Sequence, residues 1–204
     1  KTKDFWEKGM TGAEFIARAL EYTAIKYVDE LFDYSDVEKY IDVVSKRNEF
    51  LVENLIPDFI SLSDLKFILT SLVRERVSIK DITYIFEKMN DFAEESAKSD
   101  LLKKVRLALA RRICAQYANE DGVISLIEIS DKTLDSFMPS FEEDEDFIIK
   151  IDGEFAEKLA RKISKKSEQL GLDVPKILVP MELRHLFFTL LSNYMNNIVV
   201  LTRE

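Results

Sequence analysis

Residues able to carry out catalysis are few and widely spaced in this chain of 204 residues. Nucleophilic catalysis needs a base beside the nucleophile, yet the only histidine, His185, lies among apolar residues of a predicted helix, about 70 positions from the only cysteine, Cys114. One histidine and one cysteine cannot supply the four ligands of a zinc site. The scattered glycines form no phosphate-binding loop. We therefore predict no catalytic residue, no cofactor, no metal and no enzymatic activity.

One acidic run, residues 142–146, has enough carboxylates to attract a cation. It lacks the alternating ligands, the central glycine and the final bidentate glutamate of an EF-hand calcium loop. An enzyme that uses a carboxylate pair, such as Asp144 with Asp146 or Glu182, is a competing hypothesis that no flanking glycine-rich or histidine-containing segment supports. The simpler interpretation is a solvated connection whose like charges discourage pairing with stray strands.

A basic stripe occurs within this acidic protein, in which 38 acidic and 29 basic side chains give a formal charge of −9. That charge repels a phosphate backbone, so no nucleic-acid partner is expected. Five cations follow one another at helical spacings of three and four: Lys158, Arg161, Lys162, Lys165 and Lys166. A solvated helix face explains them simply. The alternative is an inter-subunit contact of this stripe with the acidic run of a neighbouring copy, because head-to-tail contact of unlike surfaces can close a ring.

Composition favours a folded chain outside the bilayer. Apolar residues make up 47% and charged residues 33%, as in ordinary globular proteins. The longest apolar runs, such as residues 198–201, are far shorter than the roughly 20 residues of a membrane span. Cys114 is predicted to be a small buried residue, which indicates a reducing compartment. The missing initiator methionine predicts a piece of a longer protein, with any membrane anchor in the missing part.

The first 118 residues are predicted to be helical, since they contain two glycines and one proline, and apolar side chains recur every three or four positions. The predicted helices cover residues 11–32, 36–54, a stretch from 63, a stretch from 79, and 99–117. Three capping boxes mark predicted helix starts: Thr11 with Glu14, Ser35 with Glu38, and Ser78 with Asp81.

After Gly122 the pattern changes to short β-prone runs separated by turns and helices. Four strands are predicted over residues 123–129, 147–151, 177–179 and 198–201. Two helices are predicted over 153–169, ending at Gly171, and 181–192. Because a helix joins the last two strands, they are expected to be parallel neighbours or next neighbours in one small sheet, with the helices packed on its face. The fold class is α+β, an all-helical part followed by a small α/β part with about four strands and two packed helices.

Residues 55–82 resemble the cytoplasmic region of the large export-gate protein of bacterial type III secretion systems and flagella. Five residues match the family's Glu-x-Val-Ser-Ile-Arg-Asp pattern: Glu75, Val77, Ser78, Ile79 and Asp81. Lys80 stands where the family usually has arginine, which keeps the charge and loses the planar fork. The resemblance continues through residues 105–114 and 176–184 to the end of the chain, and favours the injectisome branch.

The resemblance implies a homo-oligomeric ring, typically nonameric, at the cytoplasmic face of the inner membrane, joined to an N-terminal membrane domain. Such rings receive export chaperones with their secreted substrates and contact other export-apparatus components. The family's cytoplasmic part usually has four subdomains, and this chain is expected to start near the end of the first and to lack the second. The expected divisions are a terminal helix at 1–34, a helical subdomain at 35–118 and an α/β subdomain at 119–204.

The family motif and the adjoining helix nominate eight residues for partner contact: Glu75, Arg76, Ser78, Lys80, Asp81, Arg106, Arg111 and Arg112. A helix cap would explain Ser78 and Asp81 equally well. A free-standing cytosolic adaptor or chaperone that binds partner helices in grooves is the alternative function. Exposed apolar residues on the first two helices, beyond those needed for a core, would favour it.

Overall fold

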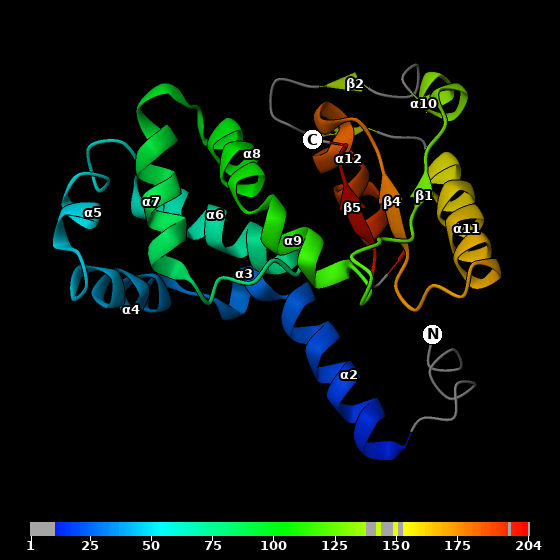
Figure 1. Ribbon diagram of the computed structural model, residues 1–204, viewed down its shortest axis with the longest axis horizontal. Coiled ribbons are helices and arrows are strands. Elements are labelled where there is room, and N and C mark those ends of the chain that lie inside the picture. The colour runs from blue at the N-terminus through cyan, green and yellow to red at the C-terminus, as the bar shows by residue number, and fades with distance from the viewer. Residues whose placement is uncertain (1–10, 138–141, 144–148, 151–152, 196, 204) are drawn as a thin grey trace. The chain divides into compact units, whose positions relative to one another are not determined.

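The computed structural model describes residues 11–137, 142–143, 149–150, 153–195 and 197–203 of the chain (Figure 1). The chain divides into two compact units, Lys1–Ile113 and Cys114–Glu204. Each unit has its own buried apolar core. Among the described residues, no helix is both long enough and apolar enough to cross a membrane.

The described part of the first unit contains helices and no strand, as predicted. The helices are α2 (Gly12–Lys26), α3 (Val28–Leu31), α4 (Tyr34–Ser45), α5 (Glu49–Glu53), α6 (Leu62–Arg74), α7 (Ile82–Phe92), a single 3-10 turn (Ala93–Glu95), α8 (Lys98–Ala108) and α9 (Ala110–Tyr117), which continues into the second unit.

Three of the long predicted helices are broken. Residues 11–32 divide at Tyr27, residues 36–54 divide between α4 and α5, and residues 99–117 divide at Leu109. The predictions of single helices were wrong because apolar periodicity continues across a break when both pieces pack on the same core. Leu109, for example, is buried although it lies between α8 and α9.

The core of the first unit lies on the predicted stripes of α6 and α7. The α6 residues of this stripe are buried: Leu65, Ile68, Leu69 and Leu72. So are the α7 residues: Ile82, Ile85, Phe86 and Met89. Both sets repeat every three or four positions, so each forms one apolar side of its helix.

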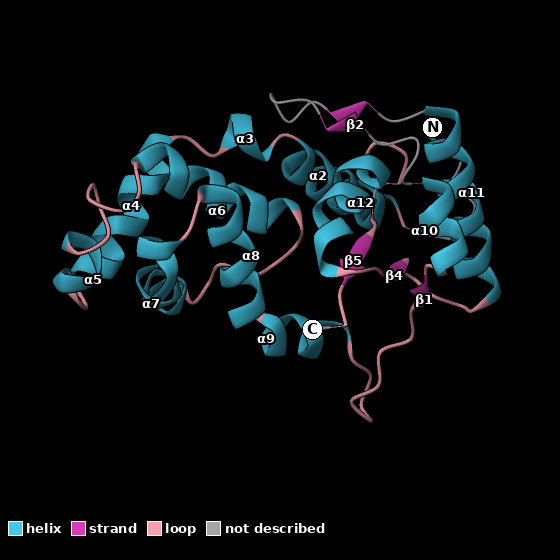
Figure 2. Cartoon of the chain, turned by 90° about the horizontal axis from the view of Figure 1, so that it is seen from above, coloured by secondary structure: helices cyan, strands magenta, loops and turns pink. Residues whose placement is uncertain are grey.

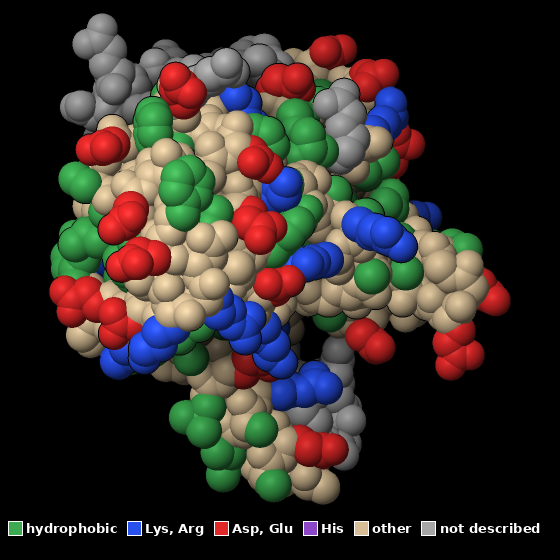
Figure 3. All heavy atoms as spheres, turned by 60° about the vertical axis from the view of Figure 1, so that its left-hand side comes forward, with side chains coloured by type: hydrophobic (Ala, Val, Ile, Leu, Met, Phe, Trp, Pro, Cys, Tyr) green, Lys and Arg blue, Asp and Glu red, His purple; other side chains and the backbone are tan. Residues whose placement is uncertain are grey.

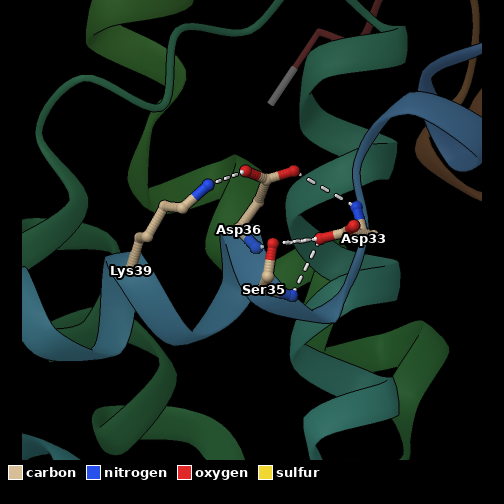
Figure 4. Close-up of polar contacts among 4 residues, drawn as sticks. All are labelled: Asp33, Ser35, Asp36 and Lys39. Carbon is tan, nitrogen blue, oxygen red and sulfur yellow. Dashed lines mark hydrogen bonds and ion pairs between the residues drawn. The ribbon is translucent and has the colours of Figure 1, made fainter.

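The capping box of Thr11 and Glu14 is confirmed, but the one predicted at Ser35 and Glu38 is wrong. Helix α4 begins two residues earlier, with Asp33 as N-cap and Asp36 closing the box (Figure 4). The Asp33 carboxylate accepts hydrogen bonds from the backbone N–H of Ser35 at 2.8 Å and of Asp36 at 3.2 Å. Aspartate and serine are comparably good caps, so the sequence pattern alone did not choose between them.

The Asp33 cap gives α4 a pH dependence. Hydrogen bonds, first from the Ser35 hydroxyl and then from the Asp36 backbone, hold the pKa of the Asp33 carboxyl below its usual value. A carboxyl whose folded pKa is lowered stabilises the fold above its unfolded pKa of about 3.9, and this stabilisation is lost as the pH falls through the lower folded value. We expect Asp33→Asn to keep the cap but to lower the Tm by a few degrees at neutral pH, and this difference to shrink below about pH 4.

The check is thermal unfolding followed by circular dichroism from neutral to acid pH. Asp42→Asn is the matched control, since Asp42 is an exposed carboxylate of α4 outside the cap. A Tm difference for Asp33→Asn that stays constant on acidification would contradict this account.

The second unit contains β1 (Ile127–Glu128), α10 (Asp131–Phe137), β2 (Glu142–Glu143), β3 (Ile149–Lys150), α11 (Gly153–Gln169), β4 (Lys176–Leu178), α12 (Met181–Ser192) and β5 (Val199–Leu201). Strands β1, β4 and β5 form a parallel sheet in that order, with Ile177 opposite Ile127 and Val200. Helices α11 and α12 lie over the same face of this sheet (Figure 2).

The predicted count of about four strands is not confirmed, because the described residues contain five short strands in two sheets. Strand β3 pairs with β2 in a separate two-stranded antiparallel sheet, and β2 comes from the beginning of the acidic run. The remainder of that run, residues 144–146, lies outside the described residues. Helix α10 was not predicted. The parallel pairing of β4 with β5 and the left-handed Gly171, with φ of 64°, are confirmed.

The prediction that Cys114 is buried was also wrong, because its side chain is exposed. The preceding residue, Ile113, is the buried one in α9. Successive helical residues point about 100° apart, so Cys114 turns away from the side that Ile113 buries. Its place in an apolar-looking stretch did not reveal this.

Candidate interaction surfaces

The eight residues nominated by the family motif lie at the end of α6, in the connection to α7, and on α8 and α9. They do not form one cluster. The structure instead places them in a buried ion pair, two further ion pairs that join helices, a local turn and two exposed cations. These groups differ in whether their side chains can contact a partner.

Glu75 and Arg106 form a buried ion pair between the end of α6 and α8. Their side chains are 4% and 9% exposed, respectively, so neither presents its charge to solvent. A charge buried in a protein interior must be paired, because the desolvation of an unpaired charge is expensive. We therefore infer that these two motif residues hold the helical unit together and do not contact a partner.

Arg76 ends α6 with backbone in the left-handed region, at φ of 59°. The Arg76 N–H donates to the carbonyl of Val73, and the Val77 N–H donates to that of Leu72, which is the Schellman pattern usually built with glycine. An arginine here retains a side chain, which forms an ion pair with Glu21 of α2. Arg76 thus ends α6 through its backbone and links α6 to α2 through its side chain.

Asp81 and Arg112 form a further ion pair, which joins the start of α7 to α9. One Asp81 oxygen caps α7 by accepting from the Tyr84 N–H at 3.3 Å, and the other accepts from Arg112 at 2.8 Å. The Arg112 guanidinium also stacks 4.3 Å from the centre of the Tyr84 ring. The predicted capping box of Ser78 with Asp81 is wrong, because Asp81 itself is the cap and α7 starts at Ile82.

The remaining nominated residues lie in the open. The Ser78 hydroxyl accepts a hydrogen bond from the Lys80 N–H at 3.4 Å, which makes a local turn. Lys80 and Arg111 are exposed, and neither has an ion-pair partner within the described part of the chain. They are the two motif cations that a partner could reach without breaking a contact of the fold.

The basic stripe predicted on α11 is exposed. Lys158 forms an ion pair with Glu154 at 2.6 Å, and Arg161 forms one with Glu157 at 2.7 Å, both four residues apart along the helix. Lys162 and Lys165 have no such partner among the described residues. Two of the five cations of the predicted stripe are therefore neutralised by their own helix.

An apolar surface on α2 and α3 was not recognised in the sequence. None of the 15 residues of α2 is buried. Ile16 is 58% exposed, Leu20 is 65% exposed, and Leu31 of α3 is 63% exposed. Apolar periodicity predicted a helix here, but the same pattern serves a core or a docking face, so only the tertiary structure could separate them.

Further apolar side chains are exposed around α4 and α5. Phe50 is 66% exposed, and Tyr34 and Val43 are about half exposed. Figure 3 shows the side of the molecule that carries α4 and α5, on which hydrophobic side chains emerge between acidic ones. This feature, named above as favouring helix docking, is thus present on both of the first two predicted helices.

The sequence of this chain matches the model of one protein family over residues 7–204. The chain belongs to the FHIPEP family. The similarity to flagellar biosynthesis protein FlhA of Bacillus subtilis is 29% identity over 149 residues, which is 72% of this chain and 22% of that protein. The resemblance to export-gate proteins seen in the sequence is therefore confirmed.

Solved structures share the fold of this FHIPEP chain. The Chlamydia pneumoniae CdsV protein, solved in complex with CdsO, aligns with a TM-score of 0.78 at 20% identity, over 94% of this chain and 56% of that one. A nonameric EscV cytosolic domain from the type III secretion system aligns with a TM-score of 0.75 at 22% identity, over 95% and 58%. The chain spans about a fifth of the FlhA protein and less than two thirds of these solved chains. The preference for the injectisome branch stays a prediction.

Proposed function

We propose that this FHIPEP chain is the cytosolic part of the export gate of a type III protein export apparatus, and that it assembles into a homo-oligomeric ring. The observation that carries the proposal is the exposed apolar side of α2 and α3, defined by Ile16, Leu20 and Leu31. Helices in proteins gain most of their stability by packing an apolar face, and α2 buries none of its residues in this chain. We therefore expect another protein surface to pack against its apolar side.

We propose that a second copy of the chain packs against this apolar side. The nonameric EscV cytosolic domain has a similar fold, which supports assembly into a ring. The α2–α3 segment is also held in place for such a contact, because Arg76 pairs with Glu21 and Arg74 pairs with Asp29. Each large apolar side chain buried against a neighbour contributes about 1.5–3 kcal/mol, so a few of them make a substantial contact.

In this proposal the ring works by docking and not by chemistry. Export chaperones with their substrates, and other export-apparatus components, would bind its surface, and the complex of CdsV with CdsO supports a role of this kind. The exposed Lys80 and Arg111 are the motif residues available to these partners. The exposed apolar residues equally suit the docking of a partner helix, so binding to another protein is the second candidate for the same surface.

A photo-crosslinking amino acid placed at Leu20, in the intact protein in its own bacterium, tests which molecule packs against this apolar side. We expect a covalent product of twice the protomer mass, because Leu20 is predicted to contact a neighbouring copy. Arg18 is the matched control position, since it is exposed on the same helix and points about 200° away from Leu20. A product with a different protein would favour the docking alternative, and no product at Leu20 would contradict both.

A further inference from the structure

The second half of α11 carries three lysines that the fold does not use. Lys162, Lys165 and Lys166 are exposed, and none of their side chains forms an ion pair or hydrogen bond within the described residues. Many other described cations are engaged: Lys39 with Asp36, Lys88 with Asp91, Lys103 with Asp100, Arg106 with Glu75, Arg112 with Asp81 and Arg203 with Glu128. Three unpaired cations gathered on one helix are therefore unusual in this protein.

The three lysines lie together outside the buried side of α11. The buried residues of the helix face the core of the second unit: Ala156, Leu159, Ala160, Ile163 and Ser167. At about 100° per residue, Lys162, Lys165 and Lys166 fall outside the arc of these buried residues and next to one another. Lys162 and Lys166 are one turn apart, about 6 Å along the axis.

The stability of α11 does not account for the cluster. Lysine in the last turn favours the negative end of the helix dipole, which explains Lys166, but that effect falls off within one turn and does not extend to Lys162. Lys162 is also three residues from Lys165 and four from Lys166, and like charges at these spacings destabilise a helix. The cluster therefore costs stability, and an external partner would explain its presence.

We propose that the lysine cluster of Lys162, Lys165 and Lys166 binds a short acidic helix of another protein. Carboxylates spaced three and four residues apart on such a helix match the spacing of the lysines when the two helices lie side by side. The partner is short because the first half of α11 carries two neutral ion pairs, Lys158 with Glu154 and Arg161 with Glu157, which add no net positive charge for an anion that runs along the whole helix. The formal charge of −9 likewise disfavours a long polyanion.

This proposal adds a partner to the docking platform proposed above, but it does not depend on the ring, because one copy presents the whole cluster. A direct binding measurement can therefore fail while ring assembly succeeds, and the reverse also holds. The two proposals are tested on different surfaces, α11 in the second unit and α2 in the first.

The experiment measures fluorescence anisotropy of a labelled, alanine-based helical peptide whose glutamates recur every three and four residues. We expect it to bind the chain, more tightly at low ionic strength. The triple variant K162Q/K165Q/K166Q is expected to weaken the Kd by about tenfold, since three surface contacts are removed together. The control variant R18Q/K46Q/R47Q removes three exposed cations from the first unit, changes the net charge equally, and is expected to leave the Kd unchanged.

Two further measurements make the outcome decisive. A peptide of identical composition with glutamates at every second position should bind more weakly, because its carboxylates do not share one helix face. The Tm of the triple variant should equal or exceed that of the parent, because like-charge repulsion is removed. Equal binding of both peptides, no binding of the first, a fall in Tm, or tighter binding to phosphatidylglycerol vesicles than to the peptide would each overturn the proposal.

Discussion

Arg106→Met is expected to destabilise the helical unit by about 3–5 kcal/mol, because it leaves the Glu75 carboxylate buried without its cation. Methionine fills a similar length of the site, so the loss of charge dominates over the loss of volume. The double variant Glu75→Leu/Arg106→Met is expected to recover most of this loss, since it removes both charges and leaves apolar side chains in their place. Urea unfolding of the three proteins gives the free energies of unfolding directly.

Arg112→Met is the matched control for this prediction. It removes the same kind of side chain from a pair with Asp81 whose side chains are about half exposed. Exposed ion pairs contribute at most about 1 kcal/mol, and stacking on Tyr84 adds a similar amount. If Arg112→Met were as destabilising as Arg106→Met, or if the double variant recovered nothing, the loss of stability would not come from an unpaired buried charge at Glu75.

Phe187→Ala is expected to destabilise the second unit by about 3–5 kcal/mol. The Phe187 side chain is fully buried in that unit's core, and its truncation leaves a cavity as well as losing apolar contact. A loss of this size is a large share of the 5–15 kcal/mol that stabilises a typical domain. Because the two units have separate cores, hydrogen exchange should accelerate in peptides of α11, α12 and the three-stranded sheet, and much less in peptides of α6 and α7.

Leu170→Ala is the companion control, because Leu170 belongs to the same unit but is 48% exposed. Its truncation removes little buried surface, so exchange in the second unit should stay close to that of the parent. Equal acceleration in both units on Phe187→Ala would show that they unfold as one, contrary to the separate cores.

The candidate residues could be nominated from the sequence, but their structural roles could not be predicted from it. Glu75 and Arg106 were nominated through the family motif and the adjoining helix, but nothing in the local pattern shows that residues 31 positions apart meet in a buried pair. The left-handed backbone conformation of Arg76 could not be predicted either, since glycine is the residue that usually indicates this conformation in a sequence. Lys80 and Arg111 stay exposed, so the prediction of partner contact is now concentrated on them.

Local patterns by themselves determined the helical character of the first unit, the apolar stripes of α6 and α7, the extents of α11 and α12 and the family, because periodicity and motifs depend only on neighbouring residues. The tertiary structure alone decided which long helices break, that β3 leaves the main sheet, that α2 keeps Leu20 exposed and that Cys114 faces outward. These outcomes depend on contacts between distant parts of the chain. An apolar residue at helical spacing has the same local signal whether a core covers it or solvent does.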